Sequence, residues 1–223
     1  MIARRLQAIE KELPSGVKLV AVSKFHPAAE VLEAFAAGQR VFGENRPQEL
    51  YAKAPVLPRE IEWHFIGHLQ TNKLKLVLPY AALVESIDSL HLLDAVQAWA
   101  DAHGKEVRVL LEVHVGAEET KGGFAPEDVP ALLSGHSAWP QVRFCGLMGM
   151  ASQTGDETRI RADFARLKAL FDQLRAEAAA RGDSALLDDF RELSMGMSGD
   201  WRIAVEYGAT IVRIGTAIFG PRA

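Results

Sequence analysis

The sequence Glu192-Leu193-Ser194-Met195-Gly196-Met197-Ser198-Gly199-Asp200-Trp201, followed by Ile211-Val212-Arg213-Ile214-Gly215-Thr216-Ala217-Ile218-Phe219-Gly220, decides the fold of this 223-residue chain. It predicts two short apolar strands, each ending in small residues, with a helix between them. At such strand-to-helix turns, unpaired backbone N–H groups and the helix dipole suit a phosphate. Two consecutive turns of this kind are typical of the phosphate site after strands 7 and 8 of a (β/α)8 barrel.

The rest of the chain supplies six earlier strands. Residues 18–23 form a nearly continuous apolar run with two β-branched valines, which is typical of a parallel strand buried on both faces. Pro27 suits the first turn of a following helix, and Gly38 suits its left-handed C-terminal cap. The same pattern repeats along the chain. The eight predicted strands lie near residues 18–23, 41–45, 63–67, 83–87, 107–113, 143–149, 192–196 and 210–215.

Strands that alternate with helices indicate either a closed parallel barrel or an open doubly wound sheet. We expect a (β/α)8 TIM barrel formed by one domain, residues 1–223, because no linker or composition shift divides the sequence. The chain ends too soon after the eighth strand for a last helix. The amphipathic N-terminal helix predicted over residues 1–12 is therefore expected to cover that gap.

Composition and charge narrow the class of protein. The chain is 48% hydrophobic and 24% charged, which is typical of a globular protein with a substantial core. The net charge of −4 gives no general attraction to nucleic acid or to an anionic membrane. No apolar run reaches the ~20 residues of a membrane helix. The single cysteine, Cys145, lies in an apolar run and predicts a buried thiol in a reducing compartment, so we expect a cytoplasmic protein.

Lys24 is the only lysine that directly ends a predicted strand, and functional side chains of barrels stand at those ends. An amine held beside cationic or apolar neighbours loses its proton more easily and becomes free to form an imine. The alternative is a surface lysine that stabilises the start of a helix. Position in the sequence leaves both interpretations open.

The last two turns also allow two interpretations. Ser194, Ser198, Gly215 and Thr216 offer hydroxyl and backbone donors to an anion, whereas Ser198 also suits an ordinary helix cap. Arg213 lies in an otherwise apolar strand, where a buried guanidinium needs a partner. That partner is either a ligand or a structural carboxylate.

Other kinds of site are not indicated. His64 and His68 are four residues apart but straddle a strand end, so we reject a zinc site. No G-x-S-x-G, P-loop or G-x-G-x-x-G motif occurs. Residues 116–125 carry charges between glycines and predict a mobile loop at the active face, where Lys121 is a further candidate anion ligand.

Five motifs spread over nearly the whole chain resemble those of one family. They are Ala21-Val22-Ser23-Lys24, Phe42-Gly43-Glu44-Asn45, Trp63-His64-Phe65-Ile66-Gly67-His68-Leu69-Gln70-Thr71-Asn72-Lys73, Ser194-Met195-Gly196-Met197-Ser198 and Arg213-Ile214-Gly215-Thr216-Ala217-Ile218-Phe219-Gly220. Together they strongly resemble the pyridoxal phosphate homeostasis protein family, also called the YggS or proline-synthase co-transcribed family. That family is related to the barrel domain of alanine racemase.

The resemblance implies a pyridoxal 5′-phosphate (PLP) site. Lys24 would form the covalent aldimine, Arg213 would face the pyridine nitrogen, and Asn45 and His64 would lie near the ring. The implied phosphate ligands are Ser194, Met197, Ser198, Gly215 and Thr216. His114 is a departure, because relatives commonly carry asparagine at this strand end, and its role stays open.

The resemblance and one missing group together suggest what the site does. An arginine at the pyridine nitrogen opposes its protonation and makes the ring a weak electron sink. A racemase also needs a second acid/base, which related enzymes supply as a tyrosine from a separate domain. Tyr51, Tyr80 and Tyr207 all fall within or at the ends of predicted helices. We therefore expect a non-catalytic PLP carrier in intracellular PLP homeostasis and amino-acid and keto-acid balance.

The implied partners are PLP itself and apo forms of PLP-dependent enzymes, with no nucleic acid and no membrane, and family analogy suggests a monomer. Two enzyme alternatives stay open at this point. One is a PLP-dependent amino-acid racemase on a one-domain barrel. The other is a Schiff-base aldolase acting on a phosphorylated sugar, which would trap substrate on Lys24 without bound PLP.

Overall fold

A computed structural model describes residues 1–116 and 122–221 of the chain. Eight parallel strands close into a barrel in chain order, and the last strand pairs with the first from Lys18↔Ile211 to Ala21↔Ile214. This pairing brings the two ends of the sequence together. The strands are β1 Lys18–Val22, β2 Val41–Glu44, β3 Glu62–Phe65, β4 Ala81–Ile87, β5 Val107–Val113, β6 Val142–Gly149, β7 Glu192–Ser194 and β8 Ile211–Ile214.

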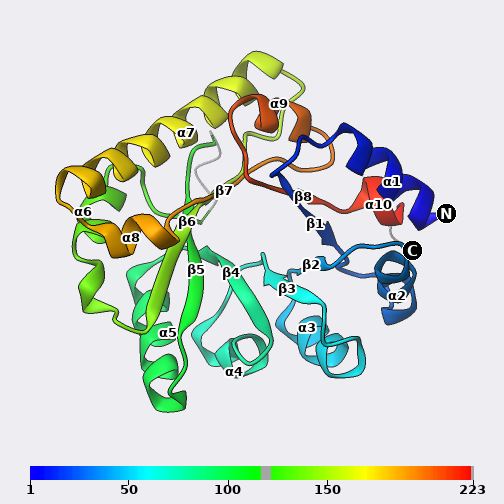
Figure 1. Ribbon diagram of the computed structural model, residues 1–223, viewed down its shortest axis with the longest axis horizontal. Helices are drawn as coiled ribbons and strands as arrows, with labels where there is room; N and C mark the ends of the chain where they lie inside the picture. Colours follow the sequence, from blue (N-terminus) through cyan, green and yellow to red (C-terminus); the bar gives the residue numbers. More distant parts are fainter. Residues whose placement is uncertain (117–121, 222–223) are drawn as a thin grey trace.

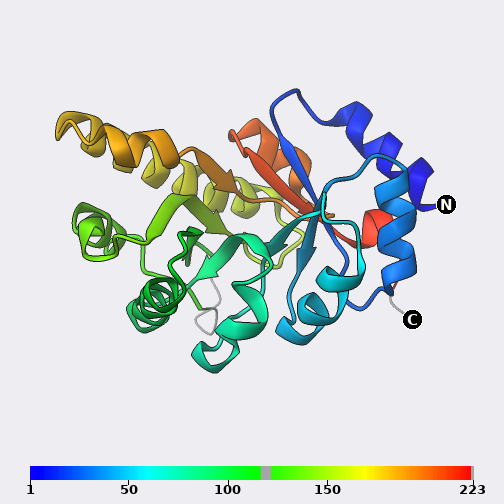
Figure 2. The ribbon, with the colours of Figure 1, turned by 60° about the horizontal axis from the view of Figure 1, so that its bottom comes forward.

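Helices surround the ring of strands in both views of the ribbon (Figures 1 and 2). They are α1 Ile2–Glu12, α2 Ala28–Ala36, α3 Pro47–Lys53, α4 Leu74–Val77, α5 Leu90–His103, α6 Val129–Ser134, α7 Glu157–Ala180, α8 Ser184–Asp189, α9 Trp201–Glu206 and α10 Thr216–Phe219. Within the described ranges, none of these helices has the length and apolar character that crossing a bilayer requires.

The predicted barrel is confirmed, and each strand lies within two residues of its expected bounds. The residues expected to begin and end the fifth helix also do so in the structure. Ser89 caps α5 by accepting the Leu92 N–H at 3.3 Å, and Gly104 ends the same helix in a left-handed conformation with φ of 57°. The continuous apolar strands are buried on both faces, as expected for parallel strands covered by helices.

The expectation that no helix follows the eighth strand is wrong. Helix α10 makes one turn directly after β8. The N-terminal helix α1 packs beside α10 and α2, and the Arg5 guanidinium donates to the Ile218 carbonyl at 3.4 Å. Figure 1 shows α1 and α10 together outside β8 and β1. The two helices therefore share the position that α1 was expected to fill alone.

The core has two parts. The larger part lies between the strands and the surrounding helices and is apolar. The smaller part lies inside the barrel and includes Cys145, which is fully buried as predicted. Charged side chains occupy the same interior: Glu85, His64 and Arg213 are all buried there. Because a buried charge is costly unless it is paired, these residues must satisfy one another or a ligand.

Candidate functional site

A cavity of about 750 Å³ opens at the carboxyl ends of the strands, the face that carries active sites in barrels of this type. Seven of the nine residues predicted for a cofactor line it. They are Lys24, Asn45, Met197, Ser198, Arg213, Gly215 and Thr216. Because β1 pairs with β8, Lys24 lies in the same cavity as the two C-terminal turns. These residues are separated by almost the whole length of the sequence.

Two predicted residues, His64 and Ser194, do not line the cavity. Both are fully buried inside the barrel. The Ser194 hydroxyl donates to Glu85 at 2.6 Å and accepts a hydrogen bond from Arg213. The His64 imidazole lies between Glu85 and Glu62. The structure therefore corrects their placement: they lie beneath Arg213 rather than at the wall of the cavity.

The turn that carries Lys24 has a strained backbone. Phe25, the next residue, has φ of 67°, and it is the one non-glycine residue with positive φ among the described residues. Its N–H donates to Glu49 Oε2 on α3 at 2.8 Å. A bulky residue adopts this conformation only where its surroundings impose it, and such residues cluster at functional sites. Glu49 thus fixes the chain on one side of Lys24.

A buried ion cluster fixes the other side of Lys24. Lys53 on α3 donates to the Ser23 carbonyl at 3.0 Å, to Glu44 at 2.6 Å and to Glu49 at 3.0 Å. The Ser23 hydroxyl donates to Glu44 at 2.7 Å. Burial raises the pKa of Glu44, although Lys53 and the Ser23 hydroxyl act to lower it. Sequence reasoning missed this cluster, because Lys53 lies far along the chain from Lys24.

The two C-terminal turns supply donors for an anion. Ser198 and Gly199 lie between β7 and α9, and Gly215 and Thr216 lie between β8 and α10. The turns touch, since the Gly215 N–H donates to Ser198 Oγ at 3.4 Å. Among the described residues, the N–H groups of Gly199 and Thr216 donate to no protein acceptor. Unpaired N–H groups and two hydroxyls form a donor set that suits a phosphate.

An acidic side chain also lies at these turns. The Asp200 carboxylate accepts the Met197 N–H at 2.6 Å, so that donor is already used. Burial raises the pKa of Asp200, while the Met197 N–H and the charge of Arg213 act to lower it. Asp200 thus orders the turn that carries Met197 and Ser198.

Asn45 offers an unpaired polar group to the cavity. Its Oδ1 atom is buried and has no hydrogen-bond partner. Its position depends on Gly67, because a Cβ on Gly67 would lie 2.1 Å from the Asn45 carbonyl oxygen. Only glycine allows β3 and β2 to end this close together. A buried amide without a partner indicates a group that is satisfied by something bound in the cavity.

Arg213 lines the cavity while its guanidinium is held from behind. Its Nη1 donates to Ser194 and lies 3.7 Å from Glu85 Oε2, and its Nη2 donates to the Gly149 carbonyl at 3.0 Å. The side chain is only 4% exposed. Arg213 therefore has a structural carboxylate, as one alternative from the sequence predicts, and it also lines the cavity. Its contact with a ligand, the other alternative, stays a prediction.

Glu112 is a cavity residue that sequence reasoning missed. Burial, and then the charge of Asp88, raise the pKa of Glu112 to about 7, although Arg213, His68 and His114 act to lower it. Asp88 and His68 line the same cavity and share a 2.9 Å contact. The sequence feature that could have indicated this residue is a glutamate near the end of an otherwise apolar strand.

The raised pKa predicts a pH dependence of stability. The folded protein binds the Glu112 proton more tightly than the unfolded chain, whose carboxyl has the ordinary pKa of 4.5. The free energy of unfolding therefore falls as pH rises from about 4.5 to about 7. We expect Glu112→Gln to raise the free energy of unfolding by about 2–3 kcal/mol more at about pH 8 than at about pH 4.5. Urea unfolding of both proteins measures this, and an equal effect at the two pH values would contradict it.

Two further sequence expectations concern neighbouring residues. His114 follows β5, and its N–H donates to the Phe124 carbonyl at 3.0 Å, but it does not line the main cavity. Lys121 and residues 117–120 of the loop predicted over 116–125 lie outside the described residues. The described residues hold no group of three or more histidine, cysteine or acidic side chains arranged for a metal ion.

Comparison with known proteins identifies the family. Residues 1–223 match the family model described as alanine racemase, N-terminal domain. The pyridoxal phosphate homeostasis protein of Aquifex aeolicus is 40% identical over 206 residues, which cover 92% of this chain and 87% of that protein. The human pyridoxal phosphate homeostasis protein is 39% identical over 233 residues, covering 99% of this chain and 81% of its own.

Comparison with solved structures supports the same family. PipY of Synechococcus elongatus PCC7942 without PLP matches with a TM-score of 0.91 and 39% identity, and PipY with PLP bound matches with 0.88 and 38%. Each match covers 99% of this chain and 100% of PipY. Alanine racemase from E. faecalis shares the fold, with a TM-score of 0.76 at 18% identity over 57% of its chain. The chain therefore belongs to the pyridoxal phosphate homeostasis protein family, built on a barrel of the alanine racemase N-terminal domain type.

Proposed function

We propose that this protein holds PLP as a Schiff base on Lys24 and serves intracellular PLP homeostasis and amino-acid and keto-acid balance without catalytic turnover. The observation that carries the proposal is that one cavity joins Lys24, Arg213 and the two turns with unpaired donors. The relatives named pyridoxal phosphate homeostasis proteins and the PLP-bound structure of PipY support it.

The residues of the cavity fit this cofactor. The group is an aldehyde, an aromatic ring with one nitrogen and a phosphate, and the cavity offers a different chemistry for each. Lys24 supplies the primary amine, the turns at Ser198–Gly199 and Gly215–Thr216 supply anion donors, and Arg213 supplies a cation. The unpaired Oδ1 of Asn45 adds a polar group that a bound ligand would satisfy.

Each residue has a separate role in the proposal. Bound PLP supplies an aldehyde that condenses reversibly with a primary amine. Lys24 is that amine, and the strained turn beside it holds the amine in place. The phosphate turns anchor the ligand when the imine is hydrolysed, so that release requires both interactions to break. Arg213 is assigned to the ring nitrogen, where its fixed positive charge opposes protonation of the ring.

The residues that face the cavity support the holding of PLP rather than its use in catalytic turnover. A ring nitrogen kept unprotonated stabilises a carbanion poorly, so reactions at the α-carbon of an amino acid gain little. Tyr51, Tyr80 and Tyr207 are absent from the lining of the cavity. The lone buried Cys145 fits a reducing compartment, and we place the protein in the cytoplasm as a monomer that passes PLP to apo-enzymes.

One observation favours a second candidate, a racemase-like enzyme. Glu112 shares the cavity with Lys24 and has a pKa of about 7, which suits a group that moves protons at neutral pH. Such an enzyme would pair Glu112 with Lys24 as its two acid/base groups.

Proton exchange in heavy water separates the two functions. The PLP-loaded protein is incubated with a panel of L- and D-amino acids, and deuterium at the α-carbon is followed by NMR. The carrier predicts no exchange beyond one equivalent of protein, together with reactivation of an apo aminotransferase on mixing. Steady exchange over many turnovers that Glu112→Gln removes would establish the racemase-like enzyme instead.

A further inference from the structure

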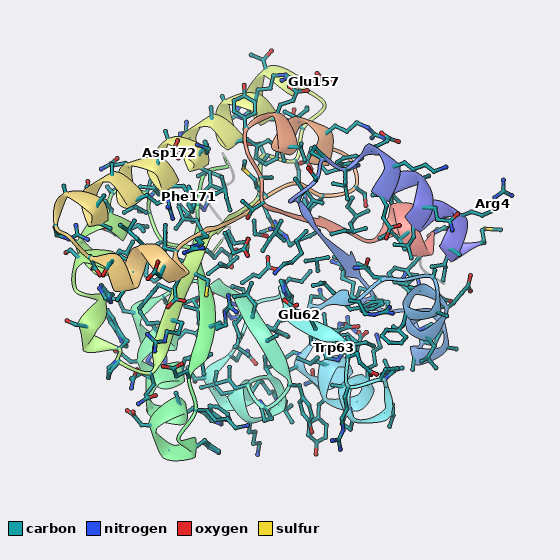
Figure 3. All side chains as sticks on the ribbon, in the orientation of Figure 1. Arg4, Glu62, Trp63, Glu157, Phe171 and Asp172 are labelled. Atoms are coloured by element: carbon teal, nitrogen blue, oxygen red, sulfur yellow. The ribbon has the colours of Figure 1, made fainter. Side chains whose placement is uncertain are left out.

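A line of alternating charges runs through the interior of the barrel from the cavity to the opposite face. Arg213 at the cavity lies against Glu85, Glu85 against His64, His64 against Glu62, and Glu62 against Lys18. Lys18 and Glu62 begin strands β1 and β3, so they lie at the amino ends of the strands. Figure 3 shows Glu62 toward the inside of the ring of strands and its neighbour Trp63 toward the surrounding helices.

Glu85 is the centre of this line, and its two oxygens face different partners. Oε1 lies 2.5 Å from His64 Nδ1, whereas Oε2 accepts the Ser194 hydroxyl at 2.6 Å and lies 3.7 Å from Arg213 Nη1. The residue is completely buried. Burial acts to raise the pKa of Glu85, but His64, Arg213 and Ser194 outweigh it and lower that pKa. Glu85 is therefore an anion fixed on both sides.

Two carboxylates favour the protonated form of His64. Burial acts to lower the pKa of His64, but its contacts with Glu62 at 3.0 Å and with Glu85 outweigh burial and raise it. The His64 contact lowers the pKa of Glu62 to about 2, against burial and with help from Lys18. Lys18 lies 3.4 Å from Glu62 and 3.7 Å from Glu192. The His64 imidazole consequently holds the Glu85 carboxylate in one orientation.

This arrangement determines which way the guanidinium of Arg213 points. Ser194, Glu85 and Gly149 take up the side of the guanidinium that faces the barrel interior. A guanidinium is planar and has five N–H donors in fixed directions, so fixing two of its nitrogens sets the direction of the donors that remain. Those donors belong to a residue that lines the cavity.

We propose that Glu85, supported by His64 and Glu62, is a positioning residue that fixes the Arg213 guanidinium against the cofactor ring. The inference rests on the proposed function, since it assigns Arg213 to bound PLP. Glu85 and His64 touch no ligand themselves and act through Arg213. Loosening Arg213 is expected to speed PLP release and to ease protonation of the ring nitrogen, which in turn lowers the pH at which the imine titrates.

The test measures the visible absorption of the PLP-loaded protein against pH, and the rate of PLP release. Glu85→Gln is expected to lower the midpoint of the imine titration by about 1 pH unit and to speed release about tenfold. Glu62→Gln, a milder change at the exposed end, is expected to shift the midpoint by about 0.3 unit in the same direction. Glu192→Gln is the matched control, because Glu192 shares Lys18 with Glu62 but has no contact with His64, and it is expected to change neither quantity.

A double-mutant cycle distinguishes positioning from general destabilisation. If Glu85 acts through Arg213, adding Glu85→Gln to Arg213→Lys is expected to change the PLP dissociation constant by less than about twofold. Additive effects, or equal shifts in Glu62→Gln and Glu192→Gln, would overturn the inference. If Glu85→Gln does not fold, the comparison of Glu62→Gln with Glu192→Gln still tests the inference. A wild-type protein without an imine band would refute the proposed function instead.

Discussion

Lys24→Ala is expected to abolish the visible imine band of the PLP-loaded protein and to weaken PLP binding at least about 100-fold, while the fold is retained. Among the described residues, Lys24 is the one lysine that lines the cavity, so we expect it to supply the covalent bond there. The two phosphate turns and Arg213 remain in the variant, and they should retain weak, non-covalent binding. Absorption spectra and equilibrium dialysis with PLP measure the two effects.

Lys105→Ala is the matched control, since Lys105 is exposed and lies outside the cavity lining. This variant is expected to keep the band and the affinity of the wild-type protein. An unchanged band in Lys24→Ala would show that the aldehyde reacts elsewhere, and the site would then be wrongly assigned.

Lys53→Met is expected to lower the free energy of unfolding by about 3–5 kcal/mol, because it leaves the buried Glu44 without its cation. Lys53 is 10% exposed and Glu44 is completely buried, so little solvent screens the pair. Without Lys53 the pKa of Glu44, already raised by burial, rises further. A carboxyl whose folded pKa is raised loses stability as pH rises, so the loss is expected to be larger at about pH 8 than at about pH 5.

Urea unfolding at the two pH values measures this loss. Lys75→Met, on the exposed face of α4, is the control and is expected to change the free energy of unfolding by less than about 0.5 kcal/mol. A loss below about 1 kcal/mol in Lys53→Met, or a larger loss at low pH, would contradict the role given to the cluster. Because Lys53 also holds the Ser23 carbonyl, the variant should bind PLP more weakly as well.

The strands could be predicted from the sequence because each is a buried parallel strand with a continuous apolar run between turn residues. Two short helices could not be predicted from the sequence. Helix α8 has six residues and α10 has four, and one turn is too short to show the 3.6-residue period that marks a helix. From the sequence alone, these residues therefore predict no helix after the last strand.

The site was predictable to the extent that strand ends mark it. The rule that functional residues stand at strand ends predicts Lys24, Arg213 and the phosphate turns. It does not predict how deep along the barrel axis each side chain lies. His64 and Ser194 lie near strand ends and yet point into the layer below the cavity. The sequence did signal that a buried Arg213 needs an anion, but it could not choose Glu85 among the acidic residues of other strands, since that depends on the register of distant strands.

The central claim is that PLP is held on Lys24, and borohydride reduction of the PLP-loaded wild-type protein tests it most directly. Reduction makes the bond to the lysine permanent and blocks tryptic cleavage there. The label is predicted on one peptide, residues 19–40, left uncut at Lys24 between the cleavage sites at Lys18 and Arg40. A label on another lysine, or a colourless protein that takes up none, would contradict the account.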